Sequence, residues 1–264
     1  MGSNSNYRAR QADTNGYIHY TDDEHSRWRQ LFARQRPILE KFATPAYLAA
    51  LERLQLPQDR IPQCEEVSSR LLEATGWRVV AVPALIDFPT FFDLLSRRRF
   101  PAASFIRSRD EMDYLEEPDI FHEILGHAPL LLDESYADFV QAYGAAGCRA
   151  STQERVWLAR LFWFTVEFGL LRSGDSLKAF GAGIVSSKSE LPYSIEDKTV
   201  ERRPFEIIDV LCTPYRIDIL QTVYFVLESL EQLYELANQD LIPWVQKART
   251  IGLKPATFNN RALG

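Results

Sequence analysis

Two of the four histidines in this 264-residue chain lie close together, at positions 122 and 127. They stand in the segment 118–131, PDIFHEILGHAPLL, among isoleucine, phenylalanine and leucine. Imidazole is the commonest metal ligand in proteins and a poor filler of an apolar core unless its nitrogens have partners. The pair His122 and His127 therefore indicates a metal site. The alternative is two core histidines that bond to backbone carbonyls.

The spacing of five residues limits how the two rings can meet. In a continuous α-helix this step turns about 500° and leaves the rings ~140° apart. Pro118 suits the first position of a helix, and Gly126 suits its end. We therefore predict a helix that starts at Pro118 and stops at Gly126, so that the next turn swings His127 back toward His122.

Glu123 follows the first histidine, as in the zinc-peptidase motif H-E-x-x-H. That motif needs its second histidine four residues after the first, where this chain has Gly126. A zinc hydrolase therefore stays as a distant alternative. Glu123 leaves the predicted helix ~100° from His122, which makes it either a contact for a cosubstrate or an ordinary solvated glutamate.

Glu167 is the only charged residue in the apolar segment 161–171, LFWFTVEFGLL. An isolated carboxylate in such surroundings is costly unless it is paired or bound to a metal. It forms either a salt bridge with Arg160 or Arg172, or the third ligand beside the two histidines. Two imidazoles and one carboxylate with open positions are typical of non-haem Fe(II) oxygenases, whereas structural zinc prefers four ligands and usually cysteine. Iron is the favoured metal.

Several separate motifs resemble those of the pterin-dependent aromatic amino acid hydroxylases. The resemblance extends from about Gly16 to about Leu253 and is closest to the short bacterial members that act on phenylalanine. In chain order the motifs are TGW (75–77), DYLEEPD (113–119), HEILGHAPL (122–130), WFTVEFG (163–169), FGAGIVSS (180–187) and PYRID (214–218). The resemblance implies a monooxygenase that uses Fe(II), O2 and a tetrahydropterin, such as tetrahydrobiopterin, to hydroxylate L-phenylalanine to L-tyrosine.

The resemblance also implies roles for individual positions. Those that match the iron ligands are His122, His127 and Glu167. Phe91 falls where the family stacks the pterin ring, and the other pterin contacts are Phe92, Ala84, Leu85 and Glu123. The substrate carboxylate is held by Arg107 and Ser186, and the substrate pocket includes Trp163, Pro118 and Phe162. We expect no catalytic side chain beyond the iron site.

The chain departs from the family at a few positions, which concern the substrate ring. Phe162 stands where relatives commonly have tyrosine, Ala128 replaces a cysteine or valine, and Phe180 replaces a tyrosine. Trp163 agrees with members that hydroxylate phenylalanine or tyrosine. Hydroxylation of L-tryptophan, or of another ring position of phenylalanine, remains the alternative within the family.

Composition limits the possible partners. The net charge of −6 and the lack of a basic stripe argue against nucleic acid. Three scattered cysteines suggest neither disulfides nor a zinc cluster, which fits a cytoplasmic location. No apolar run is long enough to span a membrane. The expected partners are an aromatic amino acid, a pterin and O2, bound by a monomer or weak dimer.

Periodicity predicts a mainly α protein with minor β structure, and the resemblance implies an aromatic amino acid hydroxylase-like catalytic domain with an iron site in a helix-lined pocket. We expect a single catalytic domain over residues 16–253, a disordered N-terminal tail over 1–15 and a C-terminal tail over 254–264. A capping box at Thr21 starts a helix that reaches about Lys41. Further helices are predicted from Pro45 to about Leu54 and from Glu65 to Ala74, the latter with Gly76 just past its end. Other predictions are a strand at 77–82, extended chain at 103–107, a helix at about 152–171, and short strands and loops at 181–203.

Overall fold

Capping residues set the bounds of the first three helices. The computed structural model describes residues 7, 9–82, 86–115 and 117–258. The helices are α1 (Asp22–Phe42), α2 (Pro45–Leu54) and α3 (Cys64–Thr75). Thr21 forms the predicted capping box of α1, the Thr44 side chain caps α2, and Gly76 ends α3 with a φ of 76°. These predicted helices are therefore confirmed.

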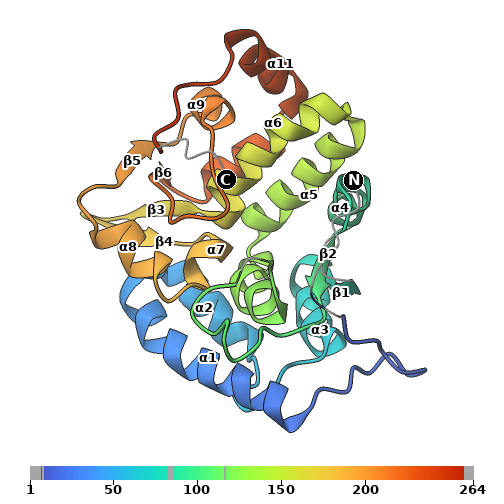
Figure 1. Cartoon of the computed structure of the whole chain (residues 1–264). Helices are drawn as coiled ribbons and strands as arrows, with labels where there is room; N and C mark the ends of the chain where they lie inside the picture. The colour runs from blue at the N-terminus through green and yellow to red at the C-terminus, as the bar shows by residue number, and fades with distance from the viewer. Residues whose placement is uncertain (1–6, 8, 83–85, 116, 259–264) are drawn as a thin grey trace, which may run out of the picture.

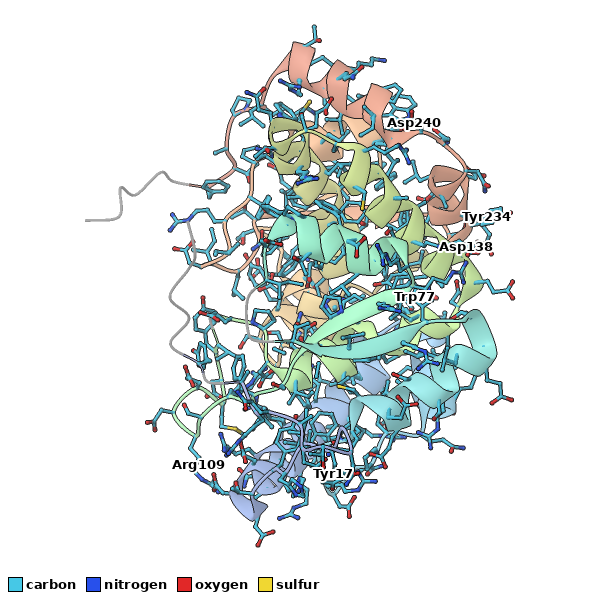
Figure 2. All side chains as sticks on the ribbon, turned by 90° about the vertical axis from the view of Figure 1, so that its right-hand side faces the viewer. Tyr17, Trp77, Arg109, Asp138, Tyr234 and Asp240 are labelled. Atoms are coloured by element: carbon cyan, nitrogen blue, oxygen red, sulfur yellow. The ribbon has the colours of Figure 1, made fainter. Side chains whose placement is uncertain are left out.

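A small parallel sheet forms one wall of the molecule. Its strands are β1 (Arg78–Val82) and β2 (Arg99–Ala103), joined through α4 (Phe88–Ser96). Figure 2 shows the two strands between α4 and α3, with Trp77 at the start of β1. Of the extended chain predicted at 103–107, only Ala103 lies in a strand, because β2 ends there. Beyond it, Ser104 bonds the carbonyl of Arg10 instead of a neighbouring strand.

The second sheet has four strands. Their order is β4 (Ser176–Ala179), β3 (Gly169–Ser173), β6 (Val223–Leu227) and β5 (Glu201–Pro204). β3 pairs antiparallel with β4 and parallel with β6, which also pairs parallel with β5. The helix predicted to continue to Leu171 was wrong, since strand β3 begins at Gly169. A short apolar run such as 169–171 fits a buried strand as well as a helix.

Two helical segments at the centre of the molecule are wound as π-helices. The first, η1 (His122–His127), continues into the 3₁₀ turn η2 (Pro129–Leu132). The second, η3 (Trp163–Glu167), directly follows α6 (Thr152–Phe162). In Figure 1 the green η1 and η2 lie between α1 and α2 on one side and α5 and α6 on the other. The predicted stop at Gly126 was wrong, because this residue lies inside η1.

The remaining helices complete the core. They are α5 (Glu134–Arg149), α7 (Ala182–Val185), α8 (Glu190–Glu196), α9 (Ile207–Cys212), α10 (Glu231–Ala237) and α11 (Leu241–Ile251). The region 181–203, predicted as strands and loops, thus contains two short helices as well as the start of β5. One large apolar cluster runs through helices and sheets, so the prediction of one mainly helical domain with minor β structure is confirmed.

The domain boundaries stay predictions. The chain before residue 16 already contacts the domain, since the ring of Tyr7 stacks on Phe105 with centroids 4.5 Å apart. Arg10 pairs with Glu24 of α1. Within the described ranges, no helix combines the length and the apolar character needed to cross a bilayer.

Candidate active site

The winding of η1 brings the two predicted histidines together. In a π-helix each N–H bonds the carbonyl five residues back, so the wider turn places residue i+5 over residue i. The Nε2 atoms of His122 and His127 lie 3.1 Å apart, and the ring planes stand at 86° to each other. The convergence was predicted, but through a helix end; the structure achieves it by continuing the helix with a different winding.

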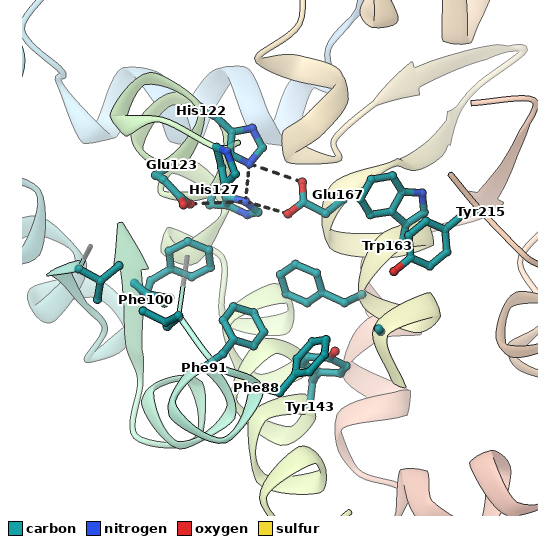
Figure 3. Close-up of a pocket in the computed structure, with 16 residues that line it drawn as sticks. Phe88, Phe91, Phe100, His122, Glu123, His127, Tyr143, Trp163, Glu167 and Tyr215 are labelled. Carbon is teal, nitrogen blue, oxygen red and sulfur yellow. Dashed lines mark hydrogen bonds and ion pairs between the residues drawn. The ribbon is translucent and has the colours of Figure 1, made fainter. Parts of the chain in front are cut away.

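Glu167 reaches the same point from the end of η3. Its Oε1 lies 3.2 Å from Nε2 of His127, and its Oε2 lies 3.6 Å from Nε2 of His122. Figure 3 shows the carboxylate facing both rings. Of the two arginines considered as salt-bridge partners, Arg172 pairs with Glu228 (2.9 Å) and Arg160 donates to a backbone carbonyl (3.0 Å).

The separation of these atoms fits a metal ion. Ligand bonds of about 2.1 Å at right angles place neighbouring ligand atoms about 3 Å apart. The nitrogen–nitrogen and shorter nitrogen–oxygen distances, 3.1 Å and 3.2 Å, match this spacing. The donor set of two imidazoles and one carboxylate suits Fe(II).

A hydrogen bond fixes which nitrogen of His122 is free for a metal. The Ser186 hydroxyl donates to the carbonyl of Ala182 (2.7 Å) and lies 2.9 Å from Nδ1 of His122. Because its proton is committed to the carbonyl, the hydroxyl accepts from Nδ1–H. The lone pair of His122 therefore sits on Nε2, the atom that faces His127 and Glu167.

Protonation states at the site also suit metal binding. Burial lowers the pKa of His122 to about 4, so the ring is neutral at physiological pH. Burial would raise the pKa of Glu167, but the two imidazoles outweigh it and hold that pKa below its ordinary value. His122 therefore offers a neutral nitrogen and Glu167 a carboxylate, which are the ligating forms of these two groups.

Glu123 carries a second carboxyl near the histidines, and its pKa shifts in the opposite direction to that of Glu167. It is buried, with Oε2 3.9 Å from Nε2 of His127. Burial, and then the charge of Glu167, raise the pKa of Glu123 well above its ordinary value. Glu123 is thus not the solvated glutamate considered from sequence. It lies close enough to His122 and His127 to form a metal-binding group with them, but its Oε2 is farther from Nε2 of His127 (3.9 Å) than Oε1 of Glu167 is (3.2 Å).

Aromatic side chains line the pocket beside these groups. Phe100 of β2 lies against the ring of His127, with centroids 4.5 Å apart. Phe162 contacts both Phe91 of α4 (5.4 Å) and Tyr143 of α5 (5.3 Å). Figure 3 shows Phe91 and Phe88 on the wall opposite Trp163.

The structure brings most of the predicted pocket residues together. Those that line the pocket with the triad are Phe91, Glu123, Pro118, Phe162 and Trp163. The side chain of Phe92 is fully buried against Tyr143 and faces Gly147, so only its backbone remains for a pterin. Ala84 and Leu85 lie outside the described residues.

Arg107 and Ser186, predicted to hold the substrate carboxylate, both have partners within the protein. Arg107 forms a two-pronged pair with the fully buried Asp119, at 2.8 and 2.9 Å. Ser186 bonds His122, as described above. Asp119 also accepts the backbone N–H of His122 (3.0 Å) and so caps the turn that carries both histidines.

Sequence analysis missed several residues of this region, among them Phe88 and Phe100. Asp119 had a usable signal, because it is a lone acid directly before the apolar residues of η1. Tyr143 and Tyr215 also line the pocket. Tyr143 had no such signal, since aromatic residues at helical spacing are ordinarily core residues.

Comparison with known proteins identifies the family. Residues 3–257 match the family described as biopterin-dependent aromatic amino acid hydroxylase. The chain is 48% identical over 252 residues to phenylalanine-4-hydroxylase of Pseudomonas aeruginosa, with 96% of each chain covered. The apo structure of the cold-active phenylalanine hydroxylase from Colwellia psychrerythraea 34H has a TM-score of 0.93 at 47% identity, covering 96% of this chain and 98% of that one.

A further solved relative carries ligands. The phenylalanine hydroxylase of Chromobacterium violaceum with bound iron(III) and oxidised 7,8-dihydrobiopterin has a TM-score of 0.86 at 37% identity, covering 96% of this chain and 93% of that one. The chain belongs to the family of biopterin-dependent aromatic amino acid hydroxylases. The zinc-hydrolase alternative is thereby set aside.

Proposed function

We propose that this protein uses Fe(II), a tetrahydropterin and O2 to hydroxylate L-phenylalanine to L-tyrosine. The observation that carries the proposal is the convergence of His122, His127 and Glu167, with contacts of 3.1 to 3.6 Å, at an aromatic pocket. The substrate is supported by the names of relatives 48% and 47% identical to the chain.

The iron and the reduced pterin, when bound, supply the oxygen chemistry. The chain's own residues hold the reactants. His122, His127 and Glu167 would hold the iron beside the pocket. Phe91 offers its ring to the pterin, and the carboxyl of Glu123, which lines the same pocket, is available to hydrogen-bond to it.

The opposite wall receives the amino acid. Trp163 provides a flat apolar surface for the substrate ring. Asp119 binds Nε and one terminal nitrogen of Arg107 and so fixes the guanidinium. The second terminal nitrogen of Arg107 is then the donor for the substrate carboxylate. Ser186 acts through His122, in place of the direct substrate contact expected from sequence.

The test is product analysis with the purified full chain, Fe(II), a tetrahydropterin and O2. L-Phenylalanine, L-tryptophan and L-tyrosine are supplied separately, with reactions lacking pterin or O2 as controls. The expected result is L-tyrosine from L-phenylalanine in the complete reaction alone. Product from tryptophan alone would make the tryptophan alternative correct, and no product from any of the three would refute the proposal.

Two further predictions stay untested. We expect a monomer or weak dimer, which sedimentation at several protein concentrations measures. We also expect a cytoplasmic location.

A further inference from the structure

Trp163 of the pocket wall is tethered by one polar contact. Its indole Nε1 donates to Oε1 of Gln221 at 3.0 Å. The faces of the same ring are packed by Tyr215, stacked at 4.4 Å and 18°, and by Phe168 at 4.5 Å. Stacking alone lets an indole slide or rotate within its plane, so the bond to Gln221 is the contact that fixes the in-plane orientation.

The other end of the Gln221 amide closes the loop that carries Tyr215. Nε2 of Gln221 donates to the carbonyls of Arg216 (2.9 Å) and Ile219 (3.0 Å). The side chain is 4% exposed, and one acceptor and two donors of its amide are used. A single buried amide therefore holds both members of the Trp163–Tyr215 stack.

A buried acid fixes the backbone of Gln221 in turn. Its N–H donates to Oε1 of Glu190 at 2.9 Å, and the hydroxyl of Tyr224 donates to the same oxygen. Glu190 is 5% exposed and begins α8, only four residues after Ser186, which bonds His122. The segment 186–190 thus connects the histidine side of the pocket to its aromatic side.

The hydrogen bonds of Trp163, Gln221 and Glu190 form a connected network that is costly to rearrange. Each buried polar group in it has a partner, and removing one partner leaves another unsatisfied at a cost of about 1–3 kcal/mol. The network lies behind the pocket wall, because Trp163 and Tyr215 line the pocket whereas Gln221 and Glu190 do not. Its effect on a bound amino acid therefore passes through the position of the two rings.

We propose that Gln221 is a positioning residue that sets the plane of the Trp163–Tyr215 stack and thereby selects which aromatic ring the pocket accepts. This inference rests on the proposed function, since it concerns the choice between phenyl and indole substrates. A shift of this wall changes the room for the substrate ring but leaves the pterin wall at α4 unchanged.

The activity test compares Gln221→Leu and Gln221→Glu with the wild-type holoenzyme. Leucine removes the amide, whereas glutamate keeps an acceptor for the indole N–H. For Gln221→Leu, we expect kcat/KM for L-phenylalanine to fall about tenfold. The substrate ratio, which is kcat/KM for L-phenylalanine divided by kcat/KM for L-tryptophan, should change at least about fivefold. The KM for the tetrahydropterin stays within about twofold of wild type. Gln221→Glu keeps the acceptor for the indole but loses both donors to the loop, so its substrate ratio is expected to lie between those of Gln221→Leu and the wild type.

Gln63→Leu is the matched control. Gln63 is also a buried glutamine, 9% exposed, and its amide bonds the backbone of Ile18 in both directions, away from the pocket lining. Gln63→Leu is expected to lower the thermal unfolding temperature without changing the substrate ratio.

If Gln221→Leu is an active enzyme with an unchanged substrate ratio, the inference is refuted and the role of Gln221 is structural. If it does not fold, Gln221→Met replaces it.

A second measurement does not depend on activity. The chain has five tryptophans, so ¹⁵N-indole labelling of the full chain before iron is added gives a small set of N–H signals. Trp163→Phe identifies the signal of Trp163. In Gln221→Leu that signal is expected to shift and its proton to exchange with solvent at least about tenfold faster.

The two measurements separate the inference from the proposed function. An unchanged Trp163 signal in Gln221→Leu would refute the tether itself. Failure of the wild-type enzyme to hydroxylate any of the three amino acids would refute the proposed function and the substrate selection with it. A wild-type enzyme that is active while Gln221→Leu keeps the wild-type ratio would refute the inference alone.

Discussion

Both π-helical turns of the pocket carry candidate metal ligands, but different contacts stabilise the two turns. Side chains from other parts of the chain hold η1. Asp119 caps its start, the Tyr47 hydroxyl donates to the carbonyl of Leu125 (2.6 Å), and Ser186 bonds His122. In η3 the bond from Trp163 to Gln221 is joined by close backbone packing, because a Cβ at Gly181 would overlap the carbonyl of Glu167.

This difference separates two ways of building a metal site. The contacts of η1 are single hydrogen bonds, so each can be removed and its effect measured. The packing around η3 is steric, so one added methyl group affects the whole turn at once. A π-turn has no strong local preference of its own and persists where surrounding contacts favour it. The following substitutions test each set of contacts, from the largest expected effect to the smallest.

Glu167→Ala tests whether η3 contributes an indispensable ligand. Iron binding and L-tyrosine formation are both expected to be lost, because two imidazoles alone make a weak iron site. Metal analysis and product chromatography measure these effects. The control Glu228→Ala removes an exposed acid that pairs with Arg172 and should leave both unchanged. A variant that retains one iron per chain would show that Glu167 is not a ligand.

Asp119→Asn removes the charge that caps η1. It leaves Arg107 buried without its counter-charge, and the free energy of unfolding is expected to fall by about 3 to 5 kcal/mol. Denaturant titration at pH 7 measures the change. The control Asp113→Asn removes an exposed acid and should change it by less than about 1 kcal/mol. An equal effect of both substitutions would contradict a special role for Asp119.

The same variant predicts a pH dependence. Burial opposes ionisation of Asp119, but Arg107 and two backbone N–H groups outweigh it and hold its pKa below the ordinary 3.8. The stabilisation is therefore fully present above that value and is lost as the pH falls through the lower folded-state pKa. The difference in unfolding free energy between wild type and Asp119→Asn should therefore decrease only at acidic pH. A decrease that begins near neutral pH would contradict this prediction.

Gly181→Ala tests the steric support of η3. The added methyl group would overlap backbone atoms of Glu167 and Gly169, and we expect a loss of about 3 kcal/mol of stability together with weaker iron binding. At Gly183 the nearest atom, 2.7 Å away, belongs to the Phe168 ring, which can move. Gly183→Ala is therefore the milder control. Equal losses in thermal unfolding would show that the packing at Gly181 is not special.

Ser186→Ala separates the two roles considered for this hydroxyl. Because Ser186 orients His122, iron affinity is expected to fall about tenfold while KM for L-phenylalanine, measured at saturating iron, stays near that of wild type. Ser187→Ala is the control, since that hydroxyl bonds the backbone N–H of Glu190. The reverse result, a raised KM with unchanged iron affinity, would restore the direct substrate contact expected from sequence.

Tyr47→Phe removes one bond from the backbone of η1 and nothing from its ligands. The expected loss is about 1 kcal/mol of unfolding free energy, because the buried carbonyl of Leu125 loses its partner. Iron affinity should stay within about twofold. Denaturant titration and metal titration measure the two quantities. A loss of iron affinity as large as that for Ser186→Ala would mean that this bond helps to set the winding of η1.

Sequence reasoning succeeded where a local rule applies. The capping box at Thr21 and the glycine at position 76 set helix bounds that the structure confirms. The lone Glu167 in an apolar segment was a sound guide to an unusual environment. The same reasoning failed at Gly126, where it ended the helix. In an α-helix, residues five apart cannot meet at one point, and the π-winding that lets them meet depends on contacts from distant parts of the chain.

Chemistry-bearing residue types and their order were determined by the sequence itself: two imidazoles, one isolated carboxylate and a series of family motifs. Tertiary structure alone decided their partners. Asp119 pairs with Arg107, Ser186 hydrogen-bonds to His122, and Gln221 accepts a hydrogen bond from Trp163. The physical reason is that a side chain's type fixes what it can bind, whereas its partner is the group that folding brings within hydrogen-bonding distance, here often more than fifty residues away along the chain.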